Sequence, residues 1–168
     1  MGPLFETATA IAAPGGDFAL AVICGRNRRL KQDLEAQDWP ILTRLYGFER
    51  RIPQMMQAAD LLVTKAGPGT IAEAINAGLP MVLYSRLPGQ EDGNVTYVVD
   101  EGVGTWAPGA DRAAASVHRW LQDPRMLQQA AAACRRIARP SAAKEIAHLI
   151  AAQLQAGQSE PPLRAGVA

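Results

Sequence analysis

The chain has 168 residues, the length of one ordinary domain, and such a chain can bury roughly 70% of its unfolded surface in a single core. Hydrophobic residues make up 48% of it, charged residues make up 20%, and the formal net charge is +1. This composition is typical of a soluble globular protein and excludes a global attraction to nucleic acid, so any function must come from local sites.

Two cysteines, Cys24 and Cys134, lie far apart and have no metal-ligand partners at a useful spacing. Neither a disulfide framework nor a metal site is predicted, and a reducing cytoplasm fits best. The longest apolar stretch, residues 18–24, is too short to span a bilayer, and the first residues do not resemble a signal peptide. We therefore expect a cytoplasmic protein whose contact with a membrane, at its inner face, is peripheral.

Apolar runs of strand length alternate along the chain with segments of helical period, and Gly, Pro and Asn separate them. The predicted strands cover residues 18–24, 41–46, 60–64, 80–84 and 103–106. The predicted helices cover residues 4–13, 27–37, 51–59, 70–77 and 91–101, and then 110–122, 124–138 and 141–155 in the Ala-rich C-terminal part.

The strand runs are apolar without alternation, as expected for strands covered on both faces of a parallel sheet. The fold predicted is α/β, a Rossmann-like doubly wound parallel sheet with a helical C-terminal region. The domain covers residues 1–155, and residues 156–168, rich in Gly, Ser and Pro, are expected to be a disordered tail. Ligands of such sheets bind beyond the carboxyl ends of the strands, so the loops there are the candidate site.

The first such loop, residues 24–31, reads CGRNRRLK and places four basic residues at the start of a predicted helix. The helix dipole disfavours cations at that end. Arg26 would be favoured there if it faced a bound anion; a solvated basic face is the alternative, and it suits Arg28, Arg29 and Lys31 better.

The second loop lies within residues 63–74, VTKAGPGTIAEA, which reads as strand, glycine turn and helix. Glycines let backbone N–H groups approach an anion, and the helix start adds partial positive charge, so a diphosphate could bind there. The segment matches neither the Walker A pattern nor GxGxxG. The structural alternative is a capping box, Thr70-x-x-Glu73, with Pro68 at the first helical position. The two interpretations are compatible.

The third loop, residues 86–94, reads RLPGQEDGN and carries side chains that donate and accept hydrogen bonds. Such groups suit the hydroxyls of a sugar. The alternative is a loop of turn formers in which Glu91 only favours the start of the next helix.

These segments, in this order, resemble the glycosyltransferase family that contains MurG and monogalactosyldiacylglycerol synthase, with the galactolipid enzymes the closer match. The resemblance runs from about Gly2 to Ala152. Its most specific parts are TKAGPGTIAEAINAGLPMVL and PGQEDGNVTYVVDEGVG, supported upstream by CGRN and by Gly47-Phe48.

The resemblance implies a GT-B enzyme in which this domain binds a UDP-sugar and a separate N-terminal domain binds the acceptor. It also implies the donor contacts residue by residue: Phe48 at the uracil pocket, largely through its backbone, Glu73 at the ribose, Gly67, Gly69 and Thr70 at the diphosphate with Arg26 and Asn27 nearby, and Gln90, Glu91 and Asn94 at the sugar.

The reaction that the resemblance implies is transfer of a hexosyl group, galactose or glucose, to a lipid hydroxyl such as that of diacylglycerol. Family members use no metal on the donor, and the chain has no Asp-x-Asp motif. No cofactor is expected beyond the UDP-sugar substrate. The general base comes from the N-terminal domain in this family, so we expect no catalytic residue in this chain and no activity from it alone.

The family reaches the region of Gly2 through a preceding strand and a glycine-rich loop, and we expect this chain to lack both. The sheet is therefore expected to lack its first strand and to have an unpaired edge, which invites another chain. The expected partners are an acceptor-binding domain or separate subunit, the lipid acceptor through that partner, and a second copy at the edge. A fragment or one half of a split enzyme would explain this pattern.

Two other functions stay open. A non-catalytic nucleotide-binding or interaction module would keep the fold without the chemistry. A UDP-sugar epimerase would use the same pocket but would need its own acid and base, for which Glu91 and Asp92 are the candidates. His118 and His148 are interpreted as packing or surface residues.

Overall fold

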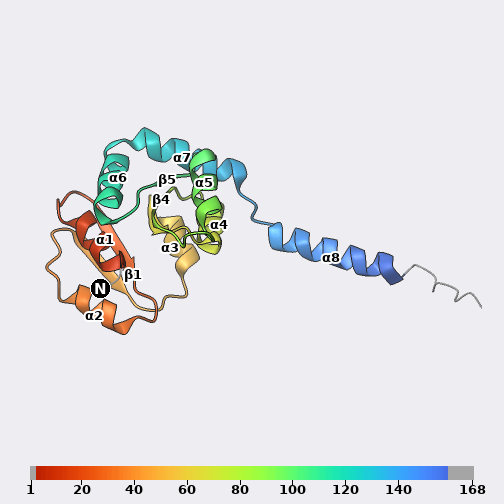
Figure 1. The fold of residues 1–168 in the computed structure, drawn as a ribbon, viewed down its shortest axis with the longest axis horizontal. Coiled ribbons are helices and arrows are strands. Elements are labelled where there is room, and N and C mark those ends of the chain that lie inside the picture. The colour runs from red at the N-terminus through yellow and green to blue at the C-terminus, as the bar shows by residue number, and fades with distance from the viewer. Residues whose placement is uncertain (1–2, 159–168) are drawn as a thin grey trace, which may run out of the picture. The chain divides into compact units, whose positions relative to one another are not determined.

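The computed structural model describes residues 3–158 as an α/β protein, shown in Figure 1. The elements are, in chain order, α1 (Pro3–Ala12), β1 (Ala19–Ile23), α2 (Arg28–Glu35), β2 (Leu42–Tyr46), α3 (Ile52–Ala58), β3 (Leu62–Lys65), α4 (Pro68–Ala77), β4 (Met81–Ser85), α5 (Asp92–Asp100), β5 (Gly104–Trp106), α6 (Ala110–Gln122), α7 (Pro124–Ile137) and α8 (Ala142–Gln158). Every predicted helix and strand is present.

Two boundaries differ from the prediction in ways that matter. Helix α4 begins at Pro68 instead of residue 70, because Gly67 is extended and Pro68 takes the first helical position. Helix α8 continues to Gln158, into the predicted tail, and the rest of that tail, residues 159–168, lies outside the described residues.

The strands are parallel, but they form two sheets instead of one. Strand β1 pairs with β2 from Ala19 opposite Leu42 to Ile23 opposite Tyr46. The second sheet has the order β3-β4-β5. Neither β1 nor β3 pairs with a further strand within residues 3–158. The parallel α/β class is confirmed, and among the described residues only β4 has a neighbouring strand on both sides.

Strand β4 lies at the centre of the larger sheet and is buried on both faces. Met81 and Leu83 belong to one apolar cluster, which also includes residues of α4 and α7. Val82 and Tyr84 belong to a second cluster on the opposite face, which includes residues of α1 and α6. Strand β4 is thus covered as a central strand of a doubly wound sheet should be.

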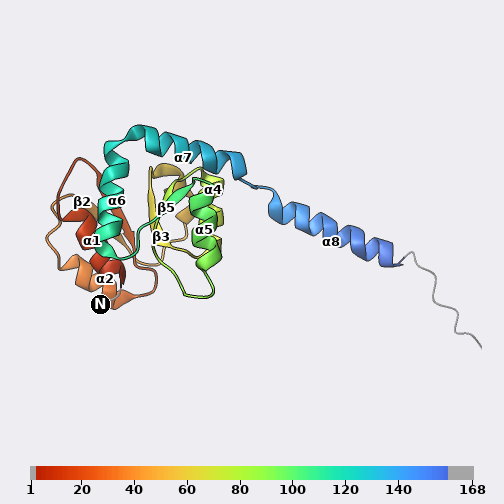
Figure 2. The same ribbon diagram turned by 45° about the horizontal axis from the view of Figure 1, so that its top comes forward.

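Helix α1 connects the two halves of the molecule. Its Ala8 packs with Val22 and Leu34 in the core of the β1–β2 half, whereas Ile11 packs with the cluster over β4. The backbone oxygen of Ile11 also lies 2.9 Å from His118 Nε2 on α6. Figures 1 and 2 show α1 and α6 side by side. The interpretation of His118 as a packing residue is confirmed.

Residues up to Ala138 form one compact unit, and Arg139 onward, including α8, forms a second. The sequence predicted one domain of residues 1–155, so the compact unit ends earlier than that. Helix α8 carries an exposed apolar stripe of Ile146, Leu149, Ile150 and Leu154. No helix within residues 3–158 has the length and apolar character needed to cross a membrane.

Candidate functional site

A hollow of about 660 Å³ lies at the carboxyl ends of β1 and β2. Its lining residues are Gly25, Arg26, Arg28, Lys31, Gly47 and Phe48. Gly25 has a φ of 58°, a left-handed conformation that lets the chain turn sharply from β1 into α2. The N–H of Cys24 donates to the oxygen of Tyr46 over 2.8 Å, which holds the two loops together.

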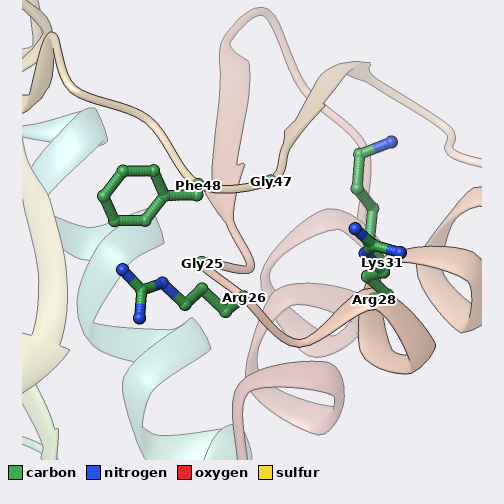
Figure 3. Close-up of a pocket in the computed structure, with 6 residues that line it drawn as sticks. All are labelled: Gly25, Arg26, Arg28, Lys31, Gly47 and Phe48. Atoms are coloured by element: carbon green, nitrogen blue, oxygen red, sulfur yellow. The ribbon is translucent and has the colours of Figure 1, made fainter.

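Two predicted site residues, Arg26 and Phe48, meet in this hollow. The guanidinium carbon of Arg26 lies 5.1 Å from the centre of the Phe48 ring, a cation–π contact. Figure 3 shows both side chains on the same side of the loops, with Arg28 and Lys31 on the other side. The Phe48 side chain is 61% exposed, so an aromatic ring with a cation beside it is open to a ligand.

The neighbouring residues have structural partners. Asn27 is the N-cap of α2, and its Oδ1 accepts a hydrogen bond of 3.0 Å from the N–H of Leu30. This bond fixes the start of the helix and engages the side chain that the resemblance places near a diphosphate. Lys31 forms an ion pair with Glu35 one turn along α2. Burial raises the pKa of the Cys24 thiol, although the charge of Lys31 opposes the shift.

The start of α4 offers unpaired backbone donors. Gly67 is the N-cap residue, and no side chain accepts a capping hydrogen bond there. The N–H groups of Gly69 and Thr70 have no acceptor among the described residues, as expected in the first turn of a helix. These donors point along the positive end of the helix dipole, which is an arrangement suited to anions.

The glycines at 67 and 69 are not required by the fold. Neither residue has a positive φ, a Cβ on Gly69 would meet nothing within 4 Å, and one on Gly67 would lie 3.9 Å from Glu91 Oε1. Glycine in a helix costs about 1 kcal/mol relative to alanine. The absence of side chains here leaves the backbone open to close approach by a ligand.

The capping-box alternative for Thr70 and Glu73 is wrong. Because α4 begins at Pro68, Thr70 lies inside its first turn and cannot be the N-cap. Glu73 is exposed and makes no hydrogen bond or ion pair with the described residues. Its carboxylate therefore has no structural partner, and its role at the ribose stays a prediction.

The third loop closes on itself through its two acidic residues. Glu91 Oε2 accepts a hydrogen bond of 2.7 Å from the N–H of Leu87, and Asp92 Oδ2 accepts one of 3.0 Å from the N–H of Gly89. Asp92 also forms an ion pair with Arg86. The structural alternative for Glu91 is thus supported by a contact, whereas Gln90 is exposed.

The second and third loops are tied together. Asn94 Nδ2 donates a hydrogen bond of 2.8 Å to the oxygen of Ala66, immediately before Gly67. The structure thereby brings Gly67, Glu91 and Asn94 close together. No hydrogen bond or ion pair within residues 3–158 joins this group to Arg26 and Phe48.

Sequence reasoning missed Glu49, which follows Phe48. Glu49 Oε1 accepts hydrogen bonds from the N–H groups of Arg50 and Arg51 and from Arg51 Nε, and Oε2 accepts one of 3.0 Å from Arg51 Nη2. These bonds, chiefly that of the Arg51 side chain, lower the pKa of Glu49 to about 2. An acid just before a predicted helix is the signal that could have found this turn.

The described residues contain no group of three or more His, Cys, Asp or Glu that could hold a metal ion.

Comparison with known families decides the identity of this domain. The model of the glycosyltransferase family 28 C-terminal domain matches residues 4–150. The chain belongs to this family. The family 28 domain thus covers the compact unit and the beginning of α8.

Plant galactolipid synthases are similar to this family 28 domain in sequence. A probable monogalactosyldiacylglycerol synthase 2 of Oryza sativa subsp. indica is 45% identical over 130 residues, which are 72% of this chain and 27% of the relative. Monogalactosyldiacylglycerol synthase 2 of Arabidopsis thaliana is 40% identical over 156 residues, 87% of this chain and 33% of the relative. The chain spans a third or less of the length of these relatives.

Solved structures show the same fold. MurG of Acinetobacter baumannii matches with a TM-score of 0.70 and 21% identity over 88% of this chain and 46% of its own. The glycotransferase of kitacinnamycin matches with a TM-score of 0.61 and 23% identity over 80% of this chain and 35% of its own. The GT-B C-terminal architecture expected for this family 28 domain is confirmed.

The expected cytoplasmic location of this family 28 domain is wrong. The similar synthases from rice, Arabidopsis and spinach are all named as chloroplastic enzymes. The spacing of two cysteines and the composition of the first residues were too indirect a basis for naming a compartment.

Proposed function

We propose that this domain binds the UDP-sugar donor of a glycosyltransferase that moves a hexosyl group, galactose or glucose, to the hydroxyl of a lipid such as diacylglycerol. The similarity to monogalactosyldiacylglycerol synthases supports the transfer and the lipid acceptor. The observation that carries donor binding is the pair of glycines at 67 and 69, which the fold does not need and which expose the backbone at the start of α4.

The proposed donor pocket uses two kinds of surface. The nucleoside would lie against Phe48, with Glu73 at the ribose hydroxyls, and the diphosphate would lie at Gly67, Gly69 and Thr70. Arg26 and Asn27 would be nearby, and Gln90, Glu91 and Asn94 would contact the sugar. Because Phe48 would meet the uracil largely through its backbone, Arg26 could keep its place over the Phe48 ring.

In this proposal the domain activates the donor without a metal. Backbone dipoles and basic side chains would stabilise the negative charge that develops on the departing UDP. A general base must still take the proton of the acceptor hydroxyl, and that base would belong to an acceptor-binding domain or subunit. The chain alone would then bind donor without transferring the sugar.

Two of the open strand edges suggest how such a partner associates. Strands β1 and β3 each have one unpaired edge among the described residues, and an unpaired edge recruits further strands. We propose that an acceptor-binding polypeptide, which would carry the lipid site, or a second copy of this chain associates there.

Titration calorimetry tests donor binding most directly. UDP, UDP-galactose, UDP-glucose and UDP-N-acetylglucosamine are titrated into the unmodified chain and into Glu73→Ala. We expect UDP to bind and the variant to lose about tenfold in affinity, because two hydrogen bonds to the ribose are worth roughly 1–2 kcal/mol. Glu145→Ala on α8 is the matched control, since Glu145 is also an exposed helical carboxylate.

The outcomes separate the candidate functions. A ranking of the sugars identifies the donor, and equal binding of UDP by Glu73→Ala contradicts the ribose contact. Failure of the folded, unmodified chain to bind any UDP compound at millimolar concentration contradicts the proposal and favours a non-catalytic interaction module.

A further inference from the structure

The loop between β4 and α5, residues 86–91, is held by the carboxylate of Asp92, the first residue of α5. Asp92 Oδ2 accepts a hydrogen bond of 3.0 Å from the N–H of Gly89. Asp92 Oδ1 forms an ion pair with Nη1 of Arg86. One carboxylate therefore contacts both the first residue of the loop and its tip.

The backbone of this loop turns at Gly89, immediately before Gln90. Gly89 has a φ of 81°, a left-handed conformation that residues with a side chain rarely adopt. The N–H groups of Gln90 and Glu91 both donate to the oxygen of Leu87, over 3.2 and 2.9 Å. The bond from Gly89 to Asp92 is made at the residue where the chain reverses, so it fixes the backbone from which the Gln90 side chain extends.

Hydrogen bonds, and not apolar packing, hold the tip of the loop. A Cβ on Gly89 would meet nothing within 4 Å, Leu87 is 55% exposed, and Gln90 is also exposed. A segment with so little apolar burial opens locally at low cost, and exposed ion pairs contribute little to global stability. Loss of the Asp92 contacts should therefore loosen the loop and leave the fold intact.

Arg86 connects the loop to the sheet. Its guanidinium carbon lies 5.6 Å from the centre of the ring of Trp106 on β5, the strand beside β4. Trp106 in turn packs against the core cluster that contains Leu83. The tip of the loop is thus linked through Asp92 and Arg86 to a residue of the larger sheet.

Two side chains of this loop are placed where a ligand can reach them. The amide of Gln90 makes no hydrogen bond with the described residues. Glu91 uses Oε2 to accept the N–H of Leu87, and its Oε1 would lie 3.9 Å from a Cβ on Gly67, so this oxygen faces the start of α4. An amide and a carboxylate oxygen are suitable partners for the hydroxyls of a sugar.

We propose that Asp92 is a positioning residue of the donor site, which holds Gln90 and Glu91 in the conformation that meets the sugar; this rests on the proposed function. The resemblance in sequence gives Asp92 no contact of its own with the donor. Without Asp92, the residues around Gly89 adopt several conformations, and a bound sugar has to order them at a cost in affinity. This cost falls on UDP-hexoses and not on UDP, because UDP has no sugar to contact Gln90.

The test is calorimetry of UDP, UDP-galactose and UDP-glucose with the unmodified chain, Asp92→Ala and Asp92→Asn. We expect Asp92→Ala to lose about tenfold in affinity for the preferred UDP-hexose, the effect of ordering two side chains, while UDP binds unchanged. Asp92→Asn should recover part of the loss, because its amide oxygen can still accept the N–H of Gly89.

A positioning role also predicts that Asp92 acts through Gln90. Gln90→Ala should weaken binding of the preferred UDP-hexose less in the Asp92→Ala background than in the unmodified chain, since the effects of coupled residues are not additive. Additive losses, or no loss for Gln90→Ala in the unmodified chain, overturn the inference.

Asp111→Ala is the matched control, because Asp111 is also an exposed carboxylate in the first turn of a helix, α6. Unchanged affinity of Asp92→Ala for the UDP-hexose overturns the role of Asp92. A fall in the melting temperature of Asp92→Ala but not of Asp111→Ala, or equal losses for UDP and the UDP-hexose, also overturns it, since both indicate a structural effect.

The unmodified chain separates this inference from the proposed function. If it binds UDP but neither UDP-hexose, the inference alone is overturned, because the loop then forms no sugar site. If it does not bind UDP, the inference and the proposed function are overturned together.

Discussion

The two halves of this domain differ in how completely their strands are covered. In the β3–β4–β5 half, Met81, Val82 and Leu83 are fully buried, because β4 has a neighbour on each side and helices on both faces. In the β1–β2 half, Ala19 and Ala21 of β1 are exposed. The apolar sequences of β1 and β4 are thus buried to different extents, and the two strands differ in the number of neighbouring strands.

The loops of the candidate site also differ between the two halves. The loops beside β3 and β4 are joined by the Asn94–Ala66 hydrogen bond and by a bond of 2.9 Å from the N–H of Ala66 to the oxygen of Ser85. On the other half, Arg26 and Phe48 meet through a cation–π contact on an exposed ring. The loops of the proposed anion site are therefore joined by hydrogen bonds, whereas Arg26 and Phe48 meet only through their side chains.

The largest expected difference is in the free energy of unfolding, between alanine substitutions of one leucine in each half. Leu83→Ala removes a fully buried side chain from β4 and should reduce the free energy of unfolding by about 3 kcal/mol. Leu42→Ala, at a position of β2 that is 61% exposed, should change it by no more than about 0.5 kcal/mol. Urea denaturation of both variants measures the difference, and similar losses at the two positions would contradict the contrast in burial.

A smaller but more specific effect is expected at Gly104 in β5. A Cβ there would lie 2.3 Å from the oxygen of Met81 and 2.8 Å from Val98 Cγ1, so Gly104→Ala should destabilise the domain by about 2 kcal/mol. Gly69→Ala is the control, because a Cβ at Gly69 meets nothing within 4 Å.

The two glycine variants should therefore separate stability from binding. Gly69→Ala should keep or slightly raise the melting temperature, since alanine favours a helix, while UDP binding weakens. Loss of stability in Gly69→Ala, or none in Gly104→Ala, would mean that the space around these glycines is assigned wrongly.

The smallest expected effect concerns the open edges of β1 and β3. Hydrogen exchange of their amides should be faster than that of β4, because a strand paired on one side leaves donors to solvent. If a second copy covers these edges, protection of β1 and β3 should rise with protein concentration while β4 stays constant. Protection that is independent of concentration argues against a dimer at this surface.

Periodicity and turn residues were enough to predict the elements of this fold. The run FALAVIC and the segment around Gly67 each became the expected strand or strand–turn–helix. The start of α4 was missed by two residues, because the pattern of Thr70 and Glu73 fits a capping box while Pro68 already fits the helix. Local signals compete at helix ends, and only the backbone conformation decides between them.

The split into two sheets could not be derived from periodicity, because hydrogen bonding between β1 and β3 depends on their separation in space. The same limit applies to the site. Spacing predicts that Arg26 and Phe48 lie at neighbouring strand ends, but not that they stack. The capture of Asn27 and Glu91 by local backbone N–H groups likewise depends on side-chain conformations that no motif encodes.

Helix α1 is separated from α6 by five strands and four helices, yet it packs most extensively against α6. The contact between Ile11 and His118 joins positions 107 residues apart. Closing so long a loop costs chain entropy before the contact returns any free energy, and folding slows when such distant contacts dominate. During synthesis, the face of α1 that carries Ile11 must therefore wait for α6, and this face is exposed to aggregation before folding is complete.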